Sequence, residues 1–241
     1  MLLQITIYTL KYVINILFLI LALTACAQSQ EETATVADSV QYKRTYGLRV
    51  GIDAASLIRT GIDPEYNGFQ VLADYRLKDR LYIAGELGNE NIDRNSDRID
   101  FKASGSYFKA GIDYNLYQNW LDMDNMVYFG ARLGAANFSQ TLTRYDLARD
   151  NNYFPIFTNM VNREFSGLTA LWLEIQLGIK VEVLNNLYLV ANLQLKRMLT
   201  EKTPDNFDNL YIPGFGRTYD TGEIGVGYTY GVMYRIPLFK K

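Results

Sequence analysis

The C-terminal stretch Glu223–Phe239, EIGVGYTYGVMYRIPLF, shows the clearest structural pattern in the chain. Apolar or aromatic residues occupy alternate positions in it: Ile224, Val226, Tyr228, Tyr230, Val232, Tyr234 and Ile236. Small or polar residues and one methionine occupy the positions between them: Gly225, Gly227, Thr229, Gly231, Met233 and Arg235. A period of two is the signature of a β-strand, and most globular strands stop after about five or six residues. This longer stretch matches a membrane-spanning barrel strand, which needs about 9–11 residues.

Seven earlier segments alternate in the same way and are predicted to be strands. Their predicted bounds are Tyr46–Ile58, Gly68–Leu77, Arg80–Gly88, Phe101–Leu116, Met126–Leu142, Phe165–Val183 and Leu187–Leu199. With the C-terminal stretch they make eight strands, an even number that returns both ends of the domain to the same side.

The connections between these strands alternate between short and long. Tight turns are expected at Lys78–Asp79 and Leu184–Asn186, and a medium connection at Tyr117–Asn125. Longer loops are expected at Arg59–Asn67, Asn89–Asp100, Thr143–Arg163 and Thr200–Thr221. Short turns on one side and long loops on the other are typical of outer-membrane barrels. The prediction is therefore an all-β fold, an eight-stranded antiparallel transmembrane up-and-down β-barrel over residues 45–239. Its interior should be polar and plugged, because eight strands enclose just enough room for their own side chains.

One face of the predicted strands carries nearly all of their charged residues. The bases are Arg49, Arg76, Lys109, Arg132, Lys180, Lys196 and Arg235, and the acids are Asp53, Asp74, Glu86, Asp113, Glu174 and Glu182. In a membrane barrel this face points inward, and we expect these residues to form a salt-bridge network there. In a soluble, lipocalin-like periplasmic barrel the apolar face would instead point inward and bind an apolar ligand. Strand length, loop asymmetry and the N-terminus favour the membrane barrel.

The N-terminal residues 1–27 resemble a bacterial signal peptide, with Lys11 before an apolar run from Tyr12 to Leu23. Two cleavage sites remain open: before Cys26, which would then be lipidated as in a lipoprotein, or after Ala27. Residues 28–44 are polar and aperiodic, and we interpret them as a flexible periplasmic leader. The expected location is the bacterial outer membrane.

Composition excludes several classes of function. The 241-residue chain has a net charge of −2, so it lacks the basic character of nucleic-acid-binding proteins. It contains no histidine, which rules out Ser-His hydrolases and His-ligated metal sites. We therefore expect no catalytic residue, no metal and no cofactor, and predict that the protein is not an enzyme. A histidine-free outer-membrane enzyme using the interior carboxylates is the third, least supported alternative.

The tail also carries the motif Thr229-x-Gly231-x-x-Tyr234-x-Ile236 shortly before Phe239. This motif resembles the signal that the outer-membrane barrel-assembly machinery recognises, although two lysines follow the aromatic residue. Together with Tyr114-Asn115-Leu116, the chain resembles small Bacteroidota outer-membrane barrels of unknown function, the PorT-like and OmpX-like group. The resemblance implies Gly231, Tyr234, Ile236 and Phe239 as the assembly signal, with membrane lipid and the assembly machinery as partners. It also implies a cell-envelope role, with secretion as one option.

Aromatic residues in the two longest loops are candidates for contacts with an unidentified protein partner. They are Tyr153, Phe154, Phe157, Phe207, Tyr211 and Phe215. The alternative is that these aromatic residues pack within their own loops instead of contacting a partner. The leading functional hypothesis is a structural or partner-binding barrel that uses its extracellular loops.

Overall fold

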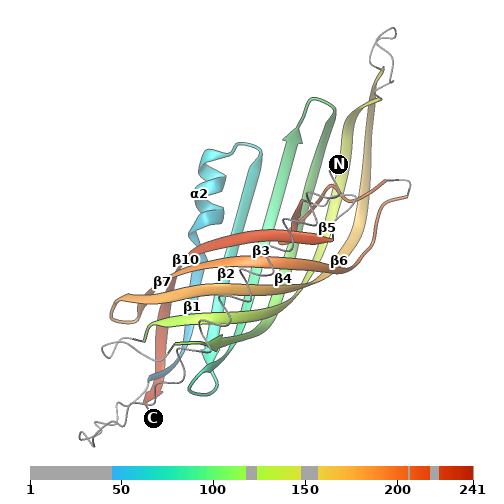
Figure 1. Ribbon diagram of the computed structural model, residues 1–241. Coiled ribbons are helices and arrows are strands. Elements are labelled where there is room, and N and C mark those ends of the chain that lie inside the picture. The colour runs from blue at the N-terminus through green and yellow to red at the C-terminus, as the bar shows by residue number, and fades with distance from the viewer. Residues whose placement is uncertain (1–44, 118–123, 148–156, 206, 218–222, 241) are drawn as a thin grey trace, which may run out of the picture. The chain divides into compact units, whose positions relative to one another are not determined.

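The computed structural model describes residues 45–117, 124–147, 157–205, 207–217 and 223–240. The predicted signal peptide, the leader and Cys26 lie outside these residues. Eight strands close into an antiparallel barrel in the order β1-β10-β7-β6-β5-β4-β3-β2 (Figure 1). Their bounds are β1 Thr45–Asp53, β2 Tyr66–Arg76, β3 Leu81–Asn95, β4 Ile99–Asn115, β5 Met126–Leu147, β6 Phe157–Leu184, β7 Leu187–Glu201 and β10 Ile224–Lys240. The predicted eight-stranded, antiparallel up-and-down barrel is confirmed.

We call the end of the barrel that holds Thr45 and Lys240 the terminal end, and the opposite end the loop end. The terminal end carries the tight turns after β2 and β6, both at the predicted positions. The loop end carries the helix α2 (Ala54–Ile62) and a small hairpin of β8 (Tyr211–Ile212) and β9 (Gly216–Arg217). No helix in the described part of the chain is long and apolar enough to cross a membrane.

The prediction that the first strand continues to Ile58 is wrong. The strand ends at Asp53, whose side chain accepts hydrogen bonds from the backbone N–H groups of Ala55 and Ser56 and so caps α2. An aspartate at this position favours a helix start because it satisfies N–H groups that have no partner within the helix. The predicted loop Arg59–Asn67 is accordingly the second half of α2 followed by the start of β2.

Two predicted loops are largely strand. Residues 89–95 extend β3 and residues 99–100 begin β4, so only a turn at residues 96–98 remains of the predicted loop Asn89–Asp100. Strand β5 continues to Leu147 and β6 begins at Phe157. These extensions are rich in polar residues on both faces, which hides the alternation, and register pairs such as Asn91↔Ser104 hold them together. Figure 1 shows the β5–β6 hairpin rising above the rest of the wall.

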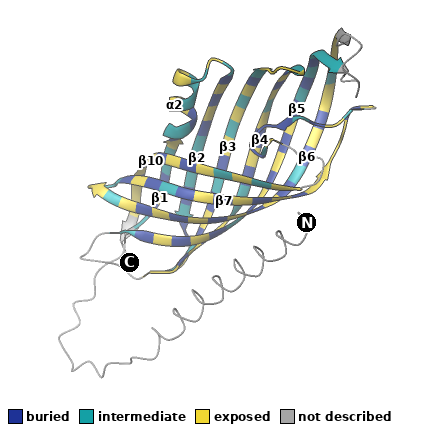
Figure 2. Cartoon of the chain, turned by 45° about the horizontal axis from the view of Figure 1, so that its top comes forward, coloured by how far each residue is buried: buried dark blue, intermediate teal, exposed yellow. Residues whose placement is uncertain are grey.

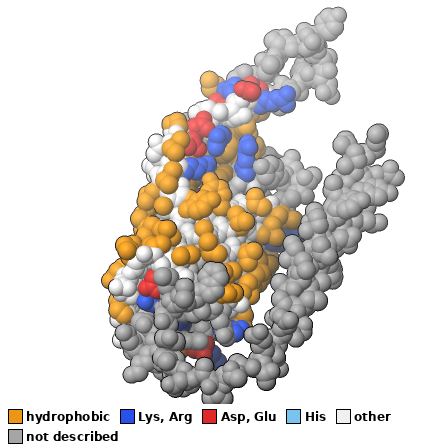
Figure 3. Space-filling model, turned by 60° about the vertical axis from the view of Figure 1, so that its left-hand side comes forward, with side chains coloured by type: hydrophobic (Ala, Val, Ile, Leu, Met, Phe, Trp, Pro, Cys, Tyr) orange, Lys and Arg blue, Asp and Glu red, His pale blue; other side chains and the backbone are white. Residues whose placement is uncertain are grey.

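The alternating pattern sorts side chains between the inside and the outside of the barrel (Figure 2). Outward positions hold exposed apolar residues, for example Leu177, Leu193 and Val226. Inward positions hold most of the charged residues that the sequence placed on the opposite face, and Glu174 and Asp113 are fully buried. Figure 3 shows hydrophobic side chains over the middle of the outer wall, with charged side chains toward its two ends. The charged face of the strands therefore points inward, opposite to the orientation that a lipocalin-like barrel requires.

Candidate functional site

A continuous chain of ion pairs fills the terminal half of the barrel. Arg49 Nε lies 2.6 Å from Asp74 Oδ1, and Lys180 Nζ bridges Asp74 Oδ2 at 2.7 Å and Asp113 Oδ2 at 2.9 Å. Arg132 Nη2 lies 2.6 Å from the other oxygen of Asp113. Bases and acids therefore alternate along this chain of contacts.

The chain of ion pairs continues toward the loop end through Glu86. Arg132 Nε lies 3.6 Å from Glu86 Oε1, and Lys109 Nζ lies 3.1 Å from Glu86 Oε2 and 3.2 Å from Glu174 Oε2. We call these eight residues the ion-pair chain: Arg49, Asp74, Lys180, Asp113, Arg132, Glu86, Lys109 and Glu174. All are at most 5% exposed. Buried charges are tolerated when they are paired and hydrogen-bonded, and here four bases meet four acids.

Strand register explains why these residues meet. The register places Arg49 opposite Asp74, Glu86 opposite Lys109 and Arg132 opposite Glu174 on neighbouring strands. Directly opposed side chains on one face of an antiparallel pair lie close enough to interact. Arg132 on β5 reaches Asp113 diagonally on the neighbouring strand β4. Other links cross the interior, as between Lys180 on β6 and Asp74 on β2.

A second, smaller cluster closes the terminal end. Arg235 contacts Asp124 at 2.7 Å and Glu182 at 3.1 Å, and Arg76 pairs with the same Asp124. Asp124 was not among the predicted residues, because it lies in a connection outside the alternating strand pattern. Only the fold shows that this connection turns its carboxylate back into the barrel.

Two residues expected in the salt-bridge network have other partners. Asp53 caps α2 and also accepts a hydrogen bond from the backbone N–H of Tyr230 at 3.2 Å. Lys196 Nζ donates to the backbone carbonyls of Gly214 at 2.8 Å and Phe215 at 3.3 Å. Both therefore act on backbone groups at the loop end, and the described structure places neither in a salt bridge.

The loop-end half is occupied by a segment that folds back into the barrel, and we call residues 208–217 the plug. Glu90 Oε2 accepts from the Tyr211 hydroxyl at 2.7 Å and from the Gly214 N–H at 3.0 Å. Gln140 accepts from the Leu210 N–H at 2.8 Å and donates to the Asp208 carbonyl at 3.3 Å. These bonds satisfy plug backbone groups that water would otherwise have to reach.

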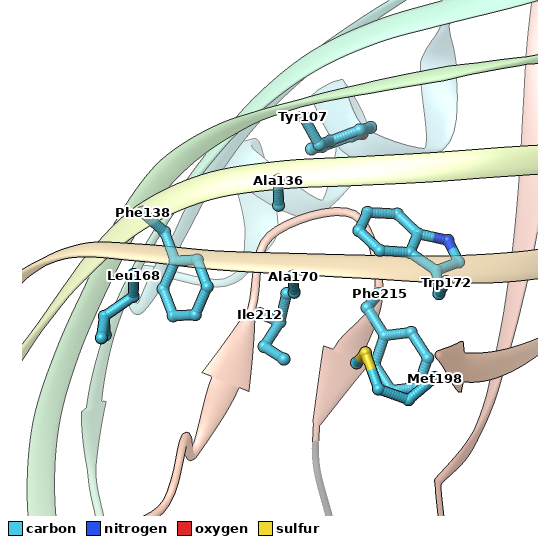
Figure 4. Close-up of a cluster of buried hydrophobic side chains, with 9 residues drawn as sticks. All are labelled: Tyr107, Ala136, Phe138, Leu168, Ala170, Trp172, Met198, Ile212 and Phe215. Atoms are coloured by element: carbon cyan, nitrogen blue, oxygen red, sulfur yellow. The ribbon is translucent and has the colours of Figure 1, made fainter. Parts of the chain in front are cut away.

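Apolar contacts also hold the plug in place (Figure 4). Ile212 and Phe215 join a buried cluster with wall residues that include Tyr107, Phe138 and Trp172. The Phe215 ring meets the Trp172 ring edge-on, with centroids 5.9 Å apart. Aromatic pairs prefer this arrangement because the edge and face of a ring carry opposite partial charges.

Tyr211 and Phe215, two of the candidate partner contacts, are buried inside the barrel, as the alternative of loop packing requires. Burial raises the pKa of the Tyr211 hydroxyl well above its ordinary value, and the neighbouring Glu90 carboxylate adds to the shift. Phe207 stacks on Phe165 at the rim, with ring centroids 6.4 Å apart. Phe157 begins β6 rather than lying in a loop, and Tyr153 and Phe154 lie outside the described residues.

The residues of the predicted assembly signal all lie in β10. Tyr234 and Ile236 point outward and are exposed, whereas Gly231 points inward beside Leu72. Phe239 pairs with Tyr46 in the register of β1 and β10. The motif is thus part of the strand that closes the barrel against β1.

A cavity of about 400 Å3 remains beside the plug. It lies between the plug, α2 and the loop-end halves of β7 and β10. By contrast, the residual space around the ion-pair chain measures about 20 Å3. Among the residues that the structure describes, no group of three or more Asp, Glu or Cys side chains could hold a metal ion. The loop-end cavity is therefore the candidate site for a ligand.

Comparisons with known proteins give a family and several structural likenesses. The family described as "Domain of unknown function (DUF6048)" matches residues 9–241. No curated protein matches the chain. Among solved structures, the attachment invasion locus protein Ail of Yersinia pestis is 10% identical with a TM-score of 0.40, covering 80% of this chain and 99% of Ail. Neisserial surface protein A is 14% identical with a TM-score of 0.41, covering 80% of this chain and 96% of that protein.

Proposed function

The chain belongs to the DUF6048 family, and we propose that it is an integral, non-enzymatic outer-membrane barrel with a sealed interior. Its loop end faces the outside of the cell and is the surface available to a partner. Its terminal end faces the periplasm, where both ends of the domain lie.

The observation that supports this proposal is the sidedness of the wall. Outward apolar side chains such as Leu177 (55% exposed) and Leu193 (68%) stand in a continuous belt, whereas Asp113 and Glu174 are fully buried. In water, this arrangement would expose a large apolar surface, which soluble monomers rarely do. In a bilayer, the same belt contacts lipid, and closure of β10 on β1 from Gly231 to Lys240 pairs the strand edges over that part of the wall.

The filled interior supports a sealed barrel rather than a pore. The ion-pair chain occupies the terminal half, and the plug occupies much of the loop-end half. The interior carboxylates of the chain all contact bases, so they form a structural network rather than an acid–base pair available to a substrate.

The finer parts of the proposal come from the sequence. Residues 1–27 direct export, Cys26 is either acylated or removed, and the motif ending at Phe239 directs assembly in the membrane. Similarity to PorT-like barrels of Bacteroidota motivates an envelope role, with secretion as the specific option. Mass spectrometry of the mature N-terminus distinguishes an acylated Cys26 from cleavage after Ala27.

Cell fractionation combined with a gel-shift assay tests the main proposal. The protein should enter the outer-membrane fraction, and boiled and unboiled samples should migrate differently, because a closed membrane barrel resists detergent unfolding. A protein that remains soluble without detergent would overturn the proposal.

A matched pair of outward substitutions tests the belt itself. Leu177→Arg lies at mid-height of the belt and should destabilise the barrel folded in lipid by about 2–4 kcal/mol. Met160→Arg replaces an exposed apolar side chain in the hairpin above the belt and should change the stability of the folded barrel by under about 0.5 kcal/mol. Refolding into liposomes measures both variants, and equal effects would contradict a lipid-facing belt.

A further inference from the structure

The barrel wall is incomplete at the loop end, beside β10. Strand β1 ends at Asp53, so β10 pairs with β1 only from Gly231 to Lys240. On its other side β10 pairs with β7 from Ile224 onward. The β10 segment from Ile224 to Tyr230 therefore has no strand partner on the β1 side, and the helix α2 stands there instead (Figure 1).

Helix α2 is fastened to β2 more firmly than to β10. The Thr60 hydroxyl accepts a hydrogen bond from the Gly68 N–H at 2.9 Å. Its single proton lies within reach of the Ser56 carbonyl at 2.9 Å and the Gly68 carbonyl at 3.1 Å. The guanidinium of Arg59 lies 3.8 Å from the centroid of the Tyr66 ring. On the side of β10, the Tyr230 N–H donates a hydrogen bond to the cap residue Asp53. The opening in the wall consequently lies between α2 and β10.

The 400 Å3 cavity borders this opening. Its lining includes buried interior residues such as Gln70 and Lys109. It also includes Ala55 and Arg59 on α2, and Val226 and Tyr228 on the segment of β10 that has no partner on the β1 side. The outer side of α2 is apolar as well, with Ile58 59% and Ile62 77% exposed. A molecule entering here would come from the lipid side rather than from the top of the barrel.

One base in the lining of the cavity has a donor available for an anionic group. The two carboxylates in its lining are already occupied: Asp53 by three backbone N–H groups, and Glu90 by two tyrosine hydroxyls and the Gly214 N–H. Lys196 lines the same cavity, is 6% exposed, and has no carboxylate within salt-bridge distance in the described structure. Its bonds to the Gly214 and Phe215 carbonyls use two of its three ammonium donors, and a phosphate oxygen is a strong acceptor for the third.

An apolar groove of about 420 Å3 begins on the outer wall next to this opening. It includes Ala54 at the start of α2 and Tyr230 on β10, and runs over Val181, Leu189 and Val232. The groove extends from the opening toward the terminal end. An outer-leaflet lipid has the same orientation, with its head at the loop end and its acyl chains pointing to the middle of the bilayer.

We propose that this opening binds a phosphorylated, acylated lipid of the outer leaflet. The phosphorylated head enters the cavity and receives a hydrogen bond from Lys196, while an acyl chain lies in the groove. This inference rests on the proposed membrane location, and it adds a specific ligand class to the site.

Native mass spectrometry of the detergent-solubilised protein tests the proposed lipid site with three probes. Phosphatidic acid carries both the phosphate and the acyl chains, diacylglycerol lacks the phosphate, and glycerol 3-phosphate lacks the chains. We expect one molecule of phosphatidic acid to bind at least about tenfold more tightly than either partial probe, a difference of about 1.4 kcal/mol. Lys196→Gln should weaken phosphatidic acid about tenfold and leave diacylglycerol unchanged.

A second variant covers the case in which Lys196→Gln disturbs the plug. Ala191→Trp fills the outer groove without touching the interior, and should weaken phosphatidic acid while leaving glycerol 3-phosphate unchanged. Lys102→Gln, which removes an exposed cation paired with Asp93 on the β3–β4 hairpin, is the matched control and should change nothing.

Equal affinity for phosphatidic acid and diacylglycerol would overturn the lipid site. So would an affinity for phosphatidic acid that neither Lys196→Gln nor Ala191→Trp changes. The barrel could then still pass the fractionation and gel-shift tests, so the two proposals fail separately. Tight binding of glycerol 3-phosphate alone would overturn the lipid part and assign the cavity to a free phosphate compound.

Discussion

The two halves of the barrel interior are filled in different ways. The terminal half is packed by side chains of the wall itself, and the pocket lined by Asp74, Glu86, Arg132 and Lys180 measures about 20 Å3. The loop-end half is filled by an inserted hairpin and retains about 400 Å3. The reason lies in the inward residues of β10: Gly225, Gly227 and Thr229 are small, and a Cβ atom on Gly225 would lie 3.1 Å from the Phe215 ring. Small wall residues make room for the plug, and the plug does not use all of it.

Breaking the ion-pair chain should have the largest effect on stability. Asp113→Asn removes a carboxylate shared by Arg132 and Lys180, and should lower the free energy of unfolding by about 3–5 kcal/mol. Urea titration of the refolded barrel, followed by the gel shift, measures the loss. Asp93→Asn breaks an ion pair whose side chains are about half exposed and should cost under about 1 kcal/mol. Equal losses would mean that the buried chain does not stabilise the barrel.

Releasing the plug should leave the barrel folded. Phe215→Ala removes the contact with Trp172 and should weaken docking of the plug by about 1.5–3 kcal/mol. Hydrogen exchange at residues 210–217 should accelerate and single-channel conductance should rise, while the gel shift persists. Phe207→Ala removes the partly buried ring that stacks on Phe165 at the rim, and should accelerate hydrogen exchange of the plug less than Phe215→Ala does. Loss of the folded band in Phe215→Ala would instead show that the plug is required for closure of the barrel.

Close packing across the wall can be tested at two glycines. The Trp172 ring lies directly over Gly134 on the neighbouring strand, so no Cβ fits there without displacing the ring. Gly134→Ala should therefore cost about 1–3 kcal/mol and shift Trp172 fluorescence. At Gly85 the nearest atom would be 3.6 Å from the new Cβ, so Gly85→Ala should be neutral or stabilise by up to about 1 kcal/mol. Similar losses in urea titration would refute the packing argument.

The smallest expected effect concerns the hydrogen bond between Tyr211 and Glu90. Tyr211→Phe should weaken docking of the plug by about 0.5–1.5 kcal/mol near neutral pH. The raised pKa of Tyr211 means that the docked plug binds this proton more tightly than the released plug. Docking is thus fully supported below the ordinary tyrosine pKa of about 10, and weakens as the pH rises from there toward the raised value.

Hydrogen exchange of residues 210–217 between pH 9 and pH 11.5 measures this dependence after correction for intrinsic exchange. The wild-type protein should show an additional loss of protection that Tyr211→Phe lacks. Tyr228→Phe, which changes an exposed outward tyrosine, should retain the wild-type profile. An identical pH profile in Tyr211→Phe would show that another group controls docking at high pH.

Particular elements show how far sequence reasoning reached. The alternation over Leu171–Val183 correctly predicted a strand and its two faces, because a period of two needs no knowledge of the partner strand. Asp53 carried a signal for the start of α2 that the apolar pattern after it concealed. The predicted loop Asn89–Asp100 became strand through pairing with β4, and such pairing depends on a partner distant from the local pattern. The sequence did not show whether Tyr211 and Phe215 lie inside or outside the barrel, because an aromatic loop residue is compatible with both positions.

Local periodicity and charge were enough to establish an eight-stranded barrel, its charged face and the tight turns after β2 and β6, since each of these follows from residues close together in the chain. The order of the ion-pair chain, the turn of Asp124 into the barrel, the docking of the plug and the opening beside α2 depend on contacts between distant residues. Those contacts arise only when the sheet closes, because closure sets which side chains share the interior and how much space they leave.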